Sequence, residues 1–155
     1  MEKIASFTVN HNVLVPGLYL SRRDGEVTTF DLRFKKPNTG DLLTNAQLHS
    51  VEHIIATLLR NSPERDAVIY FGPMGCQTGF YFLFDSRRLT DAEAIALLQR
   101  VFTAGAAYDG PMPGKSAAEC GNYRNLDAAL ARDCCAFYAD VIRRWTPEDL
   151  VYPEA

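Results

Sequence analysis

One helix, expected over residues 44–61, constrains the fold of this chain more than any other feature. Thr44 followed by Gln47 forms the capping-box pattern that is typical of a helix start. At about 100° per residue, one arc of this helix is apolar and carries Leu43, Leu48, Val51, Ile54, Ile55, Leu58 and Leu59. The opposite arc carries His49, Glu52, His53, Ala56 and Arg60. The helix is therefore expected to pack on a sheet with its apolar side, while its polar side needs cover from elsewhere.

The order of the other elements predicts what that sheet is. Extended segments are expected at 4–9, 13–20, 27–34, 67–71 and 79–84, and the turn at 23–25 favours antiparallel pairing. A second capping box, Thr90 with Glu93, opens a helix that should stop before Gly105, and the last helix is expected over 126–145. Strands segregated from helices predict the α+β class: an antiparallel β-sheet with helices packed on one face, in a single domain over residues 1–155.

Composition and charge exclude several kinds of partner. The chain has 155 residues, 47% of them hydrophobic, as expected for one globular core. Its formal charge of −3 offers no broad attraction to nucleic acid or anionic lipid. No apolar run approaches the roughly 20 residues that span a bilayer, and the N-terminus has no signal-peptide pattern. We therefore expect a cytoplasmic protein with reduced cysteines.

The spacing of His49, Glu52 and His53 predicts a divalent-metal site. Positions i, i+3 and i+4 of a helix lie side by side, and this is the HxxEH signature in which two imidazoles converge on one ion. Cys120 is the best third ligand, because it lies in a long Gly-rich loop over 105–123 that could reach the helix. The alternatives are a pair of surface or core histidines and an inert loop thiol.

The remaining candidates are less specific. Cys76 lies between glycines in the turn at 72–79, where a nearby metal or arginine would favour its thiolate, although a lone turn cysteine can equally be structural. Cys134 is expected in the core, and Cys135 has no assigned partner. Arg33, beside Asp31, is either a surface ion pair or an anion-binding group.

Five motifs in order make the chain resemble the S-ribosylhomocysteine lyase family over nearly its whole length. They are Ser6-Phe7 with His11-Asn12, residues 30–34 with Pro37-Asn38, residues 49–53, residues 73–79, and Cys120-Gly121. Two rivals remain: an HxxEH metallohydrolase or peptidase, in which the glutamate activates a metal-bound water, and a non-catalytic module built around a closed four-ligand metal site.

The resemblance implies a complete set of roles. One divalent ion per subunit, Fe(II) with Zn(II) or Co(II) as substitutes, would be held by His49, His53 and Cys120. Glu52 and Cys76 would be the acid–base pair. The pocket-lining residues would be Ser6, His11, Arg33 and Arg60. The resemblance further implies a homodimer with active sites at the subunit interface, cleaving S-ribosylhomocysteine to homocysteine and the autoinducer-2 precursor, and hence a place in quorum sensing or homocysteine metabolism.

Overall fold

A four-stranded antiparallel sheet forms one layer of the molecule. The computed structural model describes residues 1–154, and its strands are β1 (Gly17–Asp24), β2 (Val27–Arg33), β3 (Val68–Pro73) and β4 (Gly79–Asp85). They lie in the order β1-β2-β4-β3, and every neighbouring pair is antiparallel.

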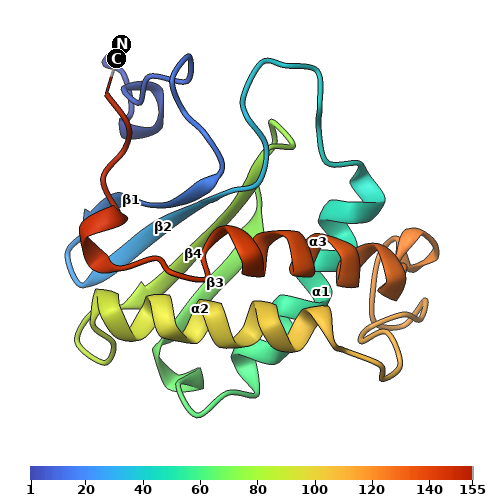
Figure 1. The fold of residues 1–155 in the computed structure, drawn as a ribbon. Helices are drawn as coiled ribbons and strands as arrows, with labels where there is room; N and C mark the ends of the chain where they lie inside the picture. Colours follow the sequence, from blue (N-terminus) through green and yellow to red (C-terminus); the bar gives the residue numbers. More distant parts are fainter. Residues whose placement is uncertain (155) are drawn as a thin grey trace.

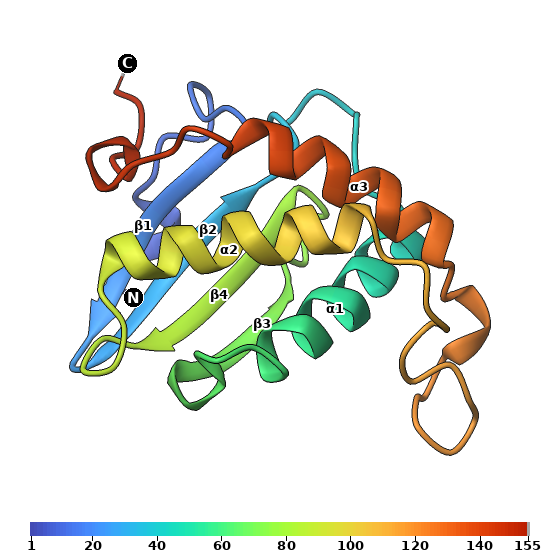
Figure 2. The same ribbon diagram turned by 60° about the horizontal axis from the view of Figure 1, so that its bottom comes forward.

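Three helices cover one face of this sheet (Figures 1 and 2): α1 (Asn45–Arg60), α2 (Asp91–Ala106) and α3 (Ala128–Val141). Single turns of 3-10 helix lie at η1 (Ala5–Phe7), η2 (Arg65–Ala67), η3 (Tyr123–Asn125) and η4 (Pro147–Asp149). The predicted α+β class is confirmed, with the helices on one face of a single compact domain.

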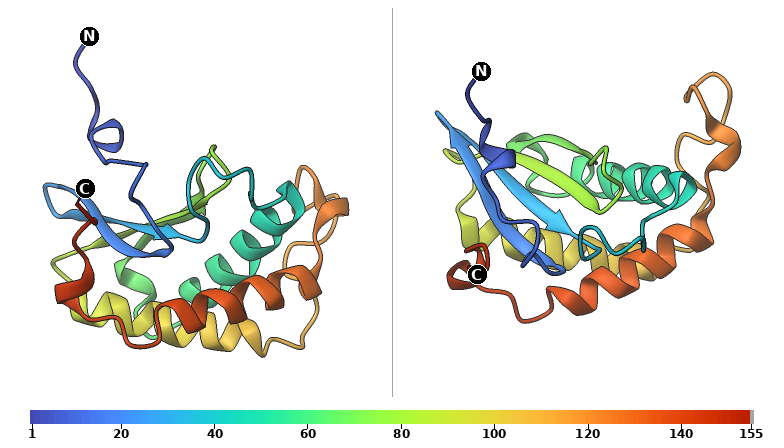
Figure 3. Two further views of the ribbon diagram at one scale, coloured as in Figure 1. Left: turned by 45° about the horizontal axis from the view of Figure 1, so that its top comes forward. Right: turned by 90° about the horizontal axis from the view of Figure 1, so that it is seen from above.

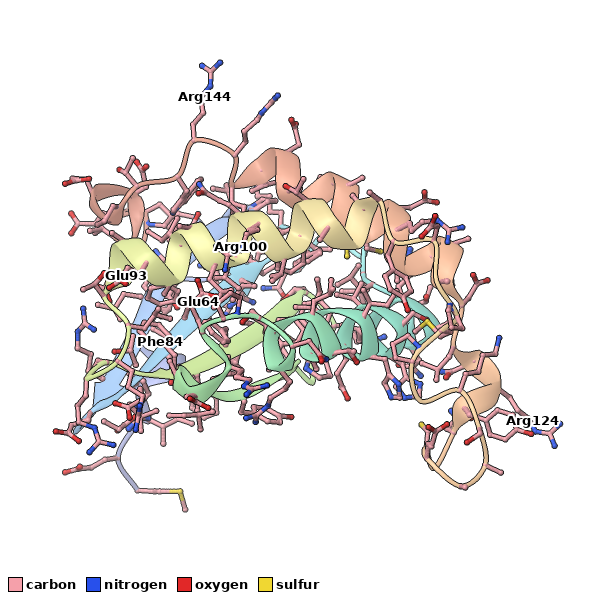
Figure 4. All side chains as sticks on the ribbon, turned by 90° about the horizontal axis from the view of Figure 1, so that it is seen from below. Glu64, Phe84, Glu93, Arg100, Arg124 and Arg144 are labelled. Atoms are coloured by element: carbon pink, nitrogen blue, oxygen red, sulfur yellow. The ribbon has the colours of Figure 1, made fainter. Side chains whose placement is uncertain are left out.

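The core lies between the sheet and the helices. Because side chains alternate along a strand, Phe30 of β2 and Phe80, Phe82 and Phe84 of β4 point to the same side, where they are fully buried. Phe34, just beyond β2, stacks on Tyr138 of α3 with ring centroids 4.2 Å apart. Both predicted capping boxes are present, on α1 and on α2. An ion pair of 2.6 Å between Glu64 and Arg100 ties the segment after α1 to α2 (Figure 4).

The prediction of a strand at 4–9 is wrong, and the next strand begins later than expected. Residues 5–7 form a 3-10 turn in which the Phe7 amide donates to the Ile4 carbonyl at 3.0 Å, and both side chains are exposed. The first strand runs over Gly17–Asp24 instead of 13–20, and its hairpin turns at Gly25, whose φ is +59°. The apolar N-terminal segment is therefore not part of the sheet among the described residues.

Two helix boundaries also differ from the prediction, at the end of α2 and at the end of α3. Gly105 lies inside α2, where a Cβ would come within 2.8 Å of the Cys135 sulfur, so this glycine permits α2 and α3 to approach closely. The inward face of α3 is centred on Cys135 and Tyr138, both 0% exposed, whereas Phe137 is 47% exposed. Cys135 thus gains a definite packing partner, and α3 ends at Val141 rather than near residue 145.

The opposite face of the sheet carries the two chain ends rather than helices (Figure 3). The amide of Leu20 on β1 donates to the carbonyl of Leu150 at 2.8 Å, which fixes the C-terminal tail along the outer strand. Residues of the N-terminal segment and of the tail line a cavity of about 610 Å³. No helix in the described part of the chain has the length and apolarity that crossing a bilayer requires.

Candidate metal centre and active site

The polar arc of α1 faces away from the sheet, as predicted. Leu48, Val51, Ile54, Ile55 and Leu59 are buried against the core. His49, Glu52 and His53 are all half-buried on the other side. Part of the cover for this arc comes from the chain itself, because the segment between α2 and α3 folds back over the two histidines.

His49, His53 and Cys120 come together as one cluster. One ligand atom from each lies within 4.8 Å of the other two, and the Cys120 sulfur is 3.3 Å from Nε2 of His49. Two ligands of a tetrahedral ion, with metal–sulfur and metal–nitrogen bonds of about 2.3 and 2.0 Å, lie roughly 3.5 Å apart. The cluster therefore has both the spacing and the donor atoms of a three-ligand metal site.

Hydrogen bonds on the far side of each imidazole orient the two rings. Nδ1 of His53 donates to the Pro113 carbonyl at 2.8 Å, and Nδ1 of His49 donates to Oδ1 of Asn125 at 2.6 Å. With Nδ1 protonated, the Nε2 lone pair of each ring is free to bind a metal, which is how metal-binding histidines are usually supported. The sequence did not reveal Asn125 and Pro113 as partners of the histidines. A loop asparagine or a loop carbonyl carries no pattern that shows which side chain it will accept a hydrogen bond from.

Cys76 belongs to a second group of side chains, at the turn between β3 and β4. Its exposed sulfur lies 3.0 Å from the hydroxyl of Thr78 and 4.0 Å from Nη1 of Arg33. His11, Cys76 and Thr78 share the wall of a cavity of about 330 Å³. The structure thus brings together three residues that the sequence named separately, Cys76, Arg33 and His11, and adds Thr78, which lies two residues after Cys76.

Arg33 is neither a surface residue nor free. Its side chain is 3% exposed, and Nη2 donates to Oδ2 of Asp31 at 2.6 Å while Nη1 donates to Thr78 at 2.7 Å. Burial opposes the charge on Arg33, but the neighbouring Asp31 carboxylate outweighs it and raises the pKa of the guanidinium above its ordinary value. A permanent positive charge therefore lies beside the Cys76 thiol.

Ser6 and Arg60 lie apart from both groups. Ser6 lines a small cavity of about 230 Å³ on the open face of the sheet, together with Tyr81 and Leu83. Arg60, at the end of α1, donates to the carbonyls of Val68 and Ile69 on β3, each at 2.8 Å. Within residues 1–154, the lining of the cavity beside Cys76 includes neither Glu52 nor any member of the metal cluster, so the candidate residues form two groups.

The chain is thus a small α+β protein with helices on one face of an antiparallel sheet. Its candidate metal centre joins two histidines of the first helix to a cysteine of the loop between α2 and α3. Comparison with known proteins makes this class specific, since the family model of S-ribosylhomocysteinase (LuxS) matches residues 4–148, and the chain belongs to this family.

Similar proteins named S-ribosylhomocysteine lyase match almost the whole chain. The protein of Finegoldia magna is 43% identical, covering 99% of this chain and 100% of its own length. Those of Clostridium beijerinckii and Desulfotalea psychrophila are 42% and 43% identical, each covering 99% of both chains. The five motifs that carried the resemblance thus belong to a similarity that extends over the full fold.

Proposed function

We propose that this chain is a carbon–sulfur lyase that cleaves S-ribosyl-L-homocysteine to L-homocysteine and 4,5-dihydroxy-2,3-pentanedione, with residues 1–155 as one metal-dependent catalytic domain. The observation that carries the proposal is the His49–His53–Cys120 cluster in a chain of this family. A cysteine in the third ligand position also speaks against the rival peptidase, whose third ligand is normally a carboxylate.

The donor set fits Fe(II), with Zn(II) or Co(II) as substitutes, since imidazole and thiolate ligands accept all three ions. With three protein ligands, a fourth position remains for substrate, as in catalytic rather than structural metal sites. A bound ion would polarise a substrate carbonyl and stabilise the negative charge that develops when an adjacent carbon loses its proton.

The protein's own residues would move those protons. The thioether at C5 becomes a good leaving group only when a carbonyl at C3 acidifies the C4 proton, so the carbonyl must first migrate from C1 to C2 and then to C3. Each migration takes a proton from one carbon and returns it to the next, and it needs neither oxidant nor reductant. We assign these transfers to the Cys76 thiolate and the Glu52 carboxylate. Removal of the C4 proton then breaks the C5–S bond, and homocysteine leaves as its thiol.

The two separated groups explain why a dimer is part of the proposal. Glu52 and the metal cluster lie on the α1 side, whereas Cys76, Arg33 and His11 gather at the β3–β4 turn, and the cavity there is lined by no member of the cluster. A homodimer would complete each site if the α1 side of one subunit faced the β3–β4 turn of its partner. The exposed apolar side chains of Phe7 and Tyr70 are consistent with a covered surface.

Substrate binding is assigned to Ser6, His11, Arg33 and Arg60. Arg33 and His11 are already beside Cys76. Ser6 and Arg60 would have to reach the substrate across the subunit interface. A reaction in the cytoplasm would supply both homocysteine for reuse and the autoinducer-2 precursor for quorum sensing.

The test is thiol release from S-ribosylhomocysteine, followed with a chromogenic disulfide, by protein purified anaerobically with Fe(II). We expect release from the metal-loaded protein and none after chelation. Cys76→Ala and Glu52→Gln should each abolish release while the metal is retained. Glu64→Gln, which changes a surface carboxylate paired with Arg100, serves as the matched control and should release thiol at the normal rate. Normal turnover by either active-site variant would remove that residue from its role, and no release by the metal-loaded dimer would refute the proposal.

A further inference from the structure

A chain of hydrogen bonds, buried at its centre, links the C-terminal tail to the Cys76 turn. The Tyr152 hydroxyl donates to Oδ2 of Asp31 at 2.8 Å. The same oxygen accepts from Nη2 of Arg33 at 2.6 Å, and Nη1 of Arg33 reaches Thr78 and Cys76. Five side chains from three separate parts of the sequence therefore form one continuous contact path.

Arg33 depends on this path for its orientation. Asp31 is 1% exposed and Arg33 is 3% exposed. Nε of Arg33 and Oδ1 of Asp31 are buried without a hydrogen-bond partner among the described residues. The guanidinium is thus held by only two nitrogens, one by Asp31 and one by Thr78, so a change at Asp31 alters one of its two attachments.

The tail is built to keep Tyr152 in place. Its ring stacks on Tyr19 with centroids 5.0 Å apart, and two residues earlier the Leu150 carbonyl accepts from the Leu20 amide. Burial, and then the charge of Asp31 and its hydrogen bond, raise the pKa of the Tyr152 hydroxyl well above its ordinary value, so this group stays protonated. Tyr152 is therefore a permanent donor to the Asp31 carboxylate.

We propose that Asp31 and Tyr152 are positioning residues for Arg33. Asp31 holds the guanidinium of Arg33 against Cys76, and the Tyr152 hydroxyl keeps the charge of Asp31 from cancelling that of Arg33. This inference rests on the proposed role of Cys76. The Tyr152 hydroxyl offsets part of the negative charge on the oxygen that Arg33 also binds, which leaves more of the arginine's field acting on the thiol. Without this donor, Asp31 draws the guanidinium away and screens it more completely.

The test is the pH dependence of alkylation at Cys76 by iodoacetamide, resolved from the other cysteines by peptide mass spectrometry, on the metal-loaded protein. We expect Tyr152→Phe to slow alkylation at pH 7 about threefold, corresponding to an upward shift of about half a pH unit in its midpoint. Tyr19→Phe is the matched control, because it removes a hydroxyl from the same aromatic stack that donates to Val15 and not to Asp31.

The other groups that face Cys76 are constant in this comparison. His11 lies across the cavity and Tyr81 projects from β4, and neither changes in the two variants. In an Arg33→Gln background, Tyr152→Phe should have no further effect, because its influence passes through Arg33. A Tyr152→Phe profile that coincides with that of Tyr19→Phe would overturn the inference, even if both variants unfold at lower temperature.

Alkylation also separates this inference from the proposed function. The measurement needs no substrate, so a shift in the Tyr152→Phe profile together with absent lyase activity would refute the function and leave the positioning role standing. Normal lyase activity together with coincident alkylation profiles of Tyr152→Phe and Tyr19→Phe would refute the positioning role and leave the function standing.

Discussion

Gly114 is the residue whose substitution tests the geometry of the metal cluster most cleanly. It follows Pro113, whose carbonyl orients His53, and its φ is +70°. A Cβ placed there would lie 2.9 Å from Nδ1 and 3.0 Å from Cε1 of the His53 ring. Gly114→Ala must therefore displace either the loop or the imidazole by a few tenths of an ångström.

This change has two separate effects, one on the stability of the fold and one on metal affinity. An alanine in the left-handed region costs about 1 kcal/mol of backbone energy, whatever surrounds it. Losing the orientation of a metal-binding histidine typically lowers metal affinity by about 10- to 100-fold, and tenfold corresponds to about 1.4 kcal/mol. We therefore expect Gly114→Ala to lose both stability and at least about tenfold in affinity.

Gly25→Ala supplies the control for backbone energy. Gly25 has a φ of +59° at the β1–β2 hairpin, with nothing within 4 Å of its Cβ position. The Gly25→Ala variant should lower the melting temperature much as Gly114→Ala does, but it should leave metal affinity unchanged. Affinity is measured by competition for Zn(II) with a chromogenic chelator. Equal affinities of Gly114→Ala and the unmodified protein would refute the assignment of His53 as an oriented ligand.

Three further predictions concern metal support, metal removal and acid stability. Asn125→Ala should weaken Zn(II) binding by about tenfold through loss of the amide that orients a ligand histidine, whereas Asn122→Ala, whose side chain makes no hydrogen bond in the described structure, should not. Chelation should lower the melting temperature and expose residues 107–127 to limited proteolysis, since binding to the native state alone stabilises it; an unchanged digestion pattern would contradict this. Hydrogen bonds from Arg87 lower the pKa of Asp85 to about 2, so Asp85 contributes stability above its ordinary pKa of 3.8 that is lost as the pH falls towards 2. Asp85→Asn should therefore lower the melting temperature at pH 7, with the difference closing between pH 4 and pH 2.

The sequence predicted those parts of the fold that depend on local patterns. Both capping boxes and the two faces of α1 depend on residues within one or two helical turns, and each is confirmed. The strand expected at 4–9 is wrong because a short apolar segment does not reveal whether a partner strand exists to pair with it. The end of α2 was misplaced because Gly105 lies inside the helix against Cys135 of α3, and such a contact between helices has no signature in the sequence of α2 itself.

Some residues of the candidate site could likewise be predicted from local sequence patterns, and others could not. His49, His53 and Cys120 could be predicted as a metal cluster because helical spacing fixes two of them and the long loop can deliver the third, and the structure brings them together. Asn125, Thr78 and Tyr152 could not, since their importance comes from contacts between segments that only the folded chain brings together. Arg33 shows the difference most clearly, because its neighbour Asp31 was visible in the sequence but its burial was not.

The central claim is that a lyase site forms from the Glu52 side of one subunit and the Cys76 side of its partner. The most direct measurement mixes Cys76→Ala with Glu52→Gln, each inactive alone, after dissociation and reassociation, and follows thiol release from S-ribosylhomocysteine. In a mixed dimer one site carries both changes and the other carries neither, so random pairing should restore about a quarter of the unmodified activity. If both residues instead act within one subunit, or if the chain is not this lyase, the mixture stays as inactive as its components.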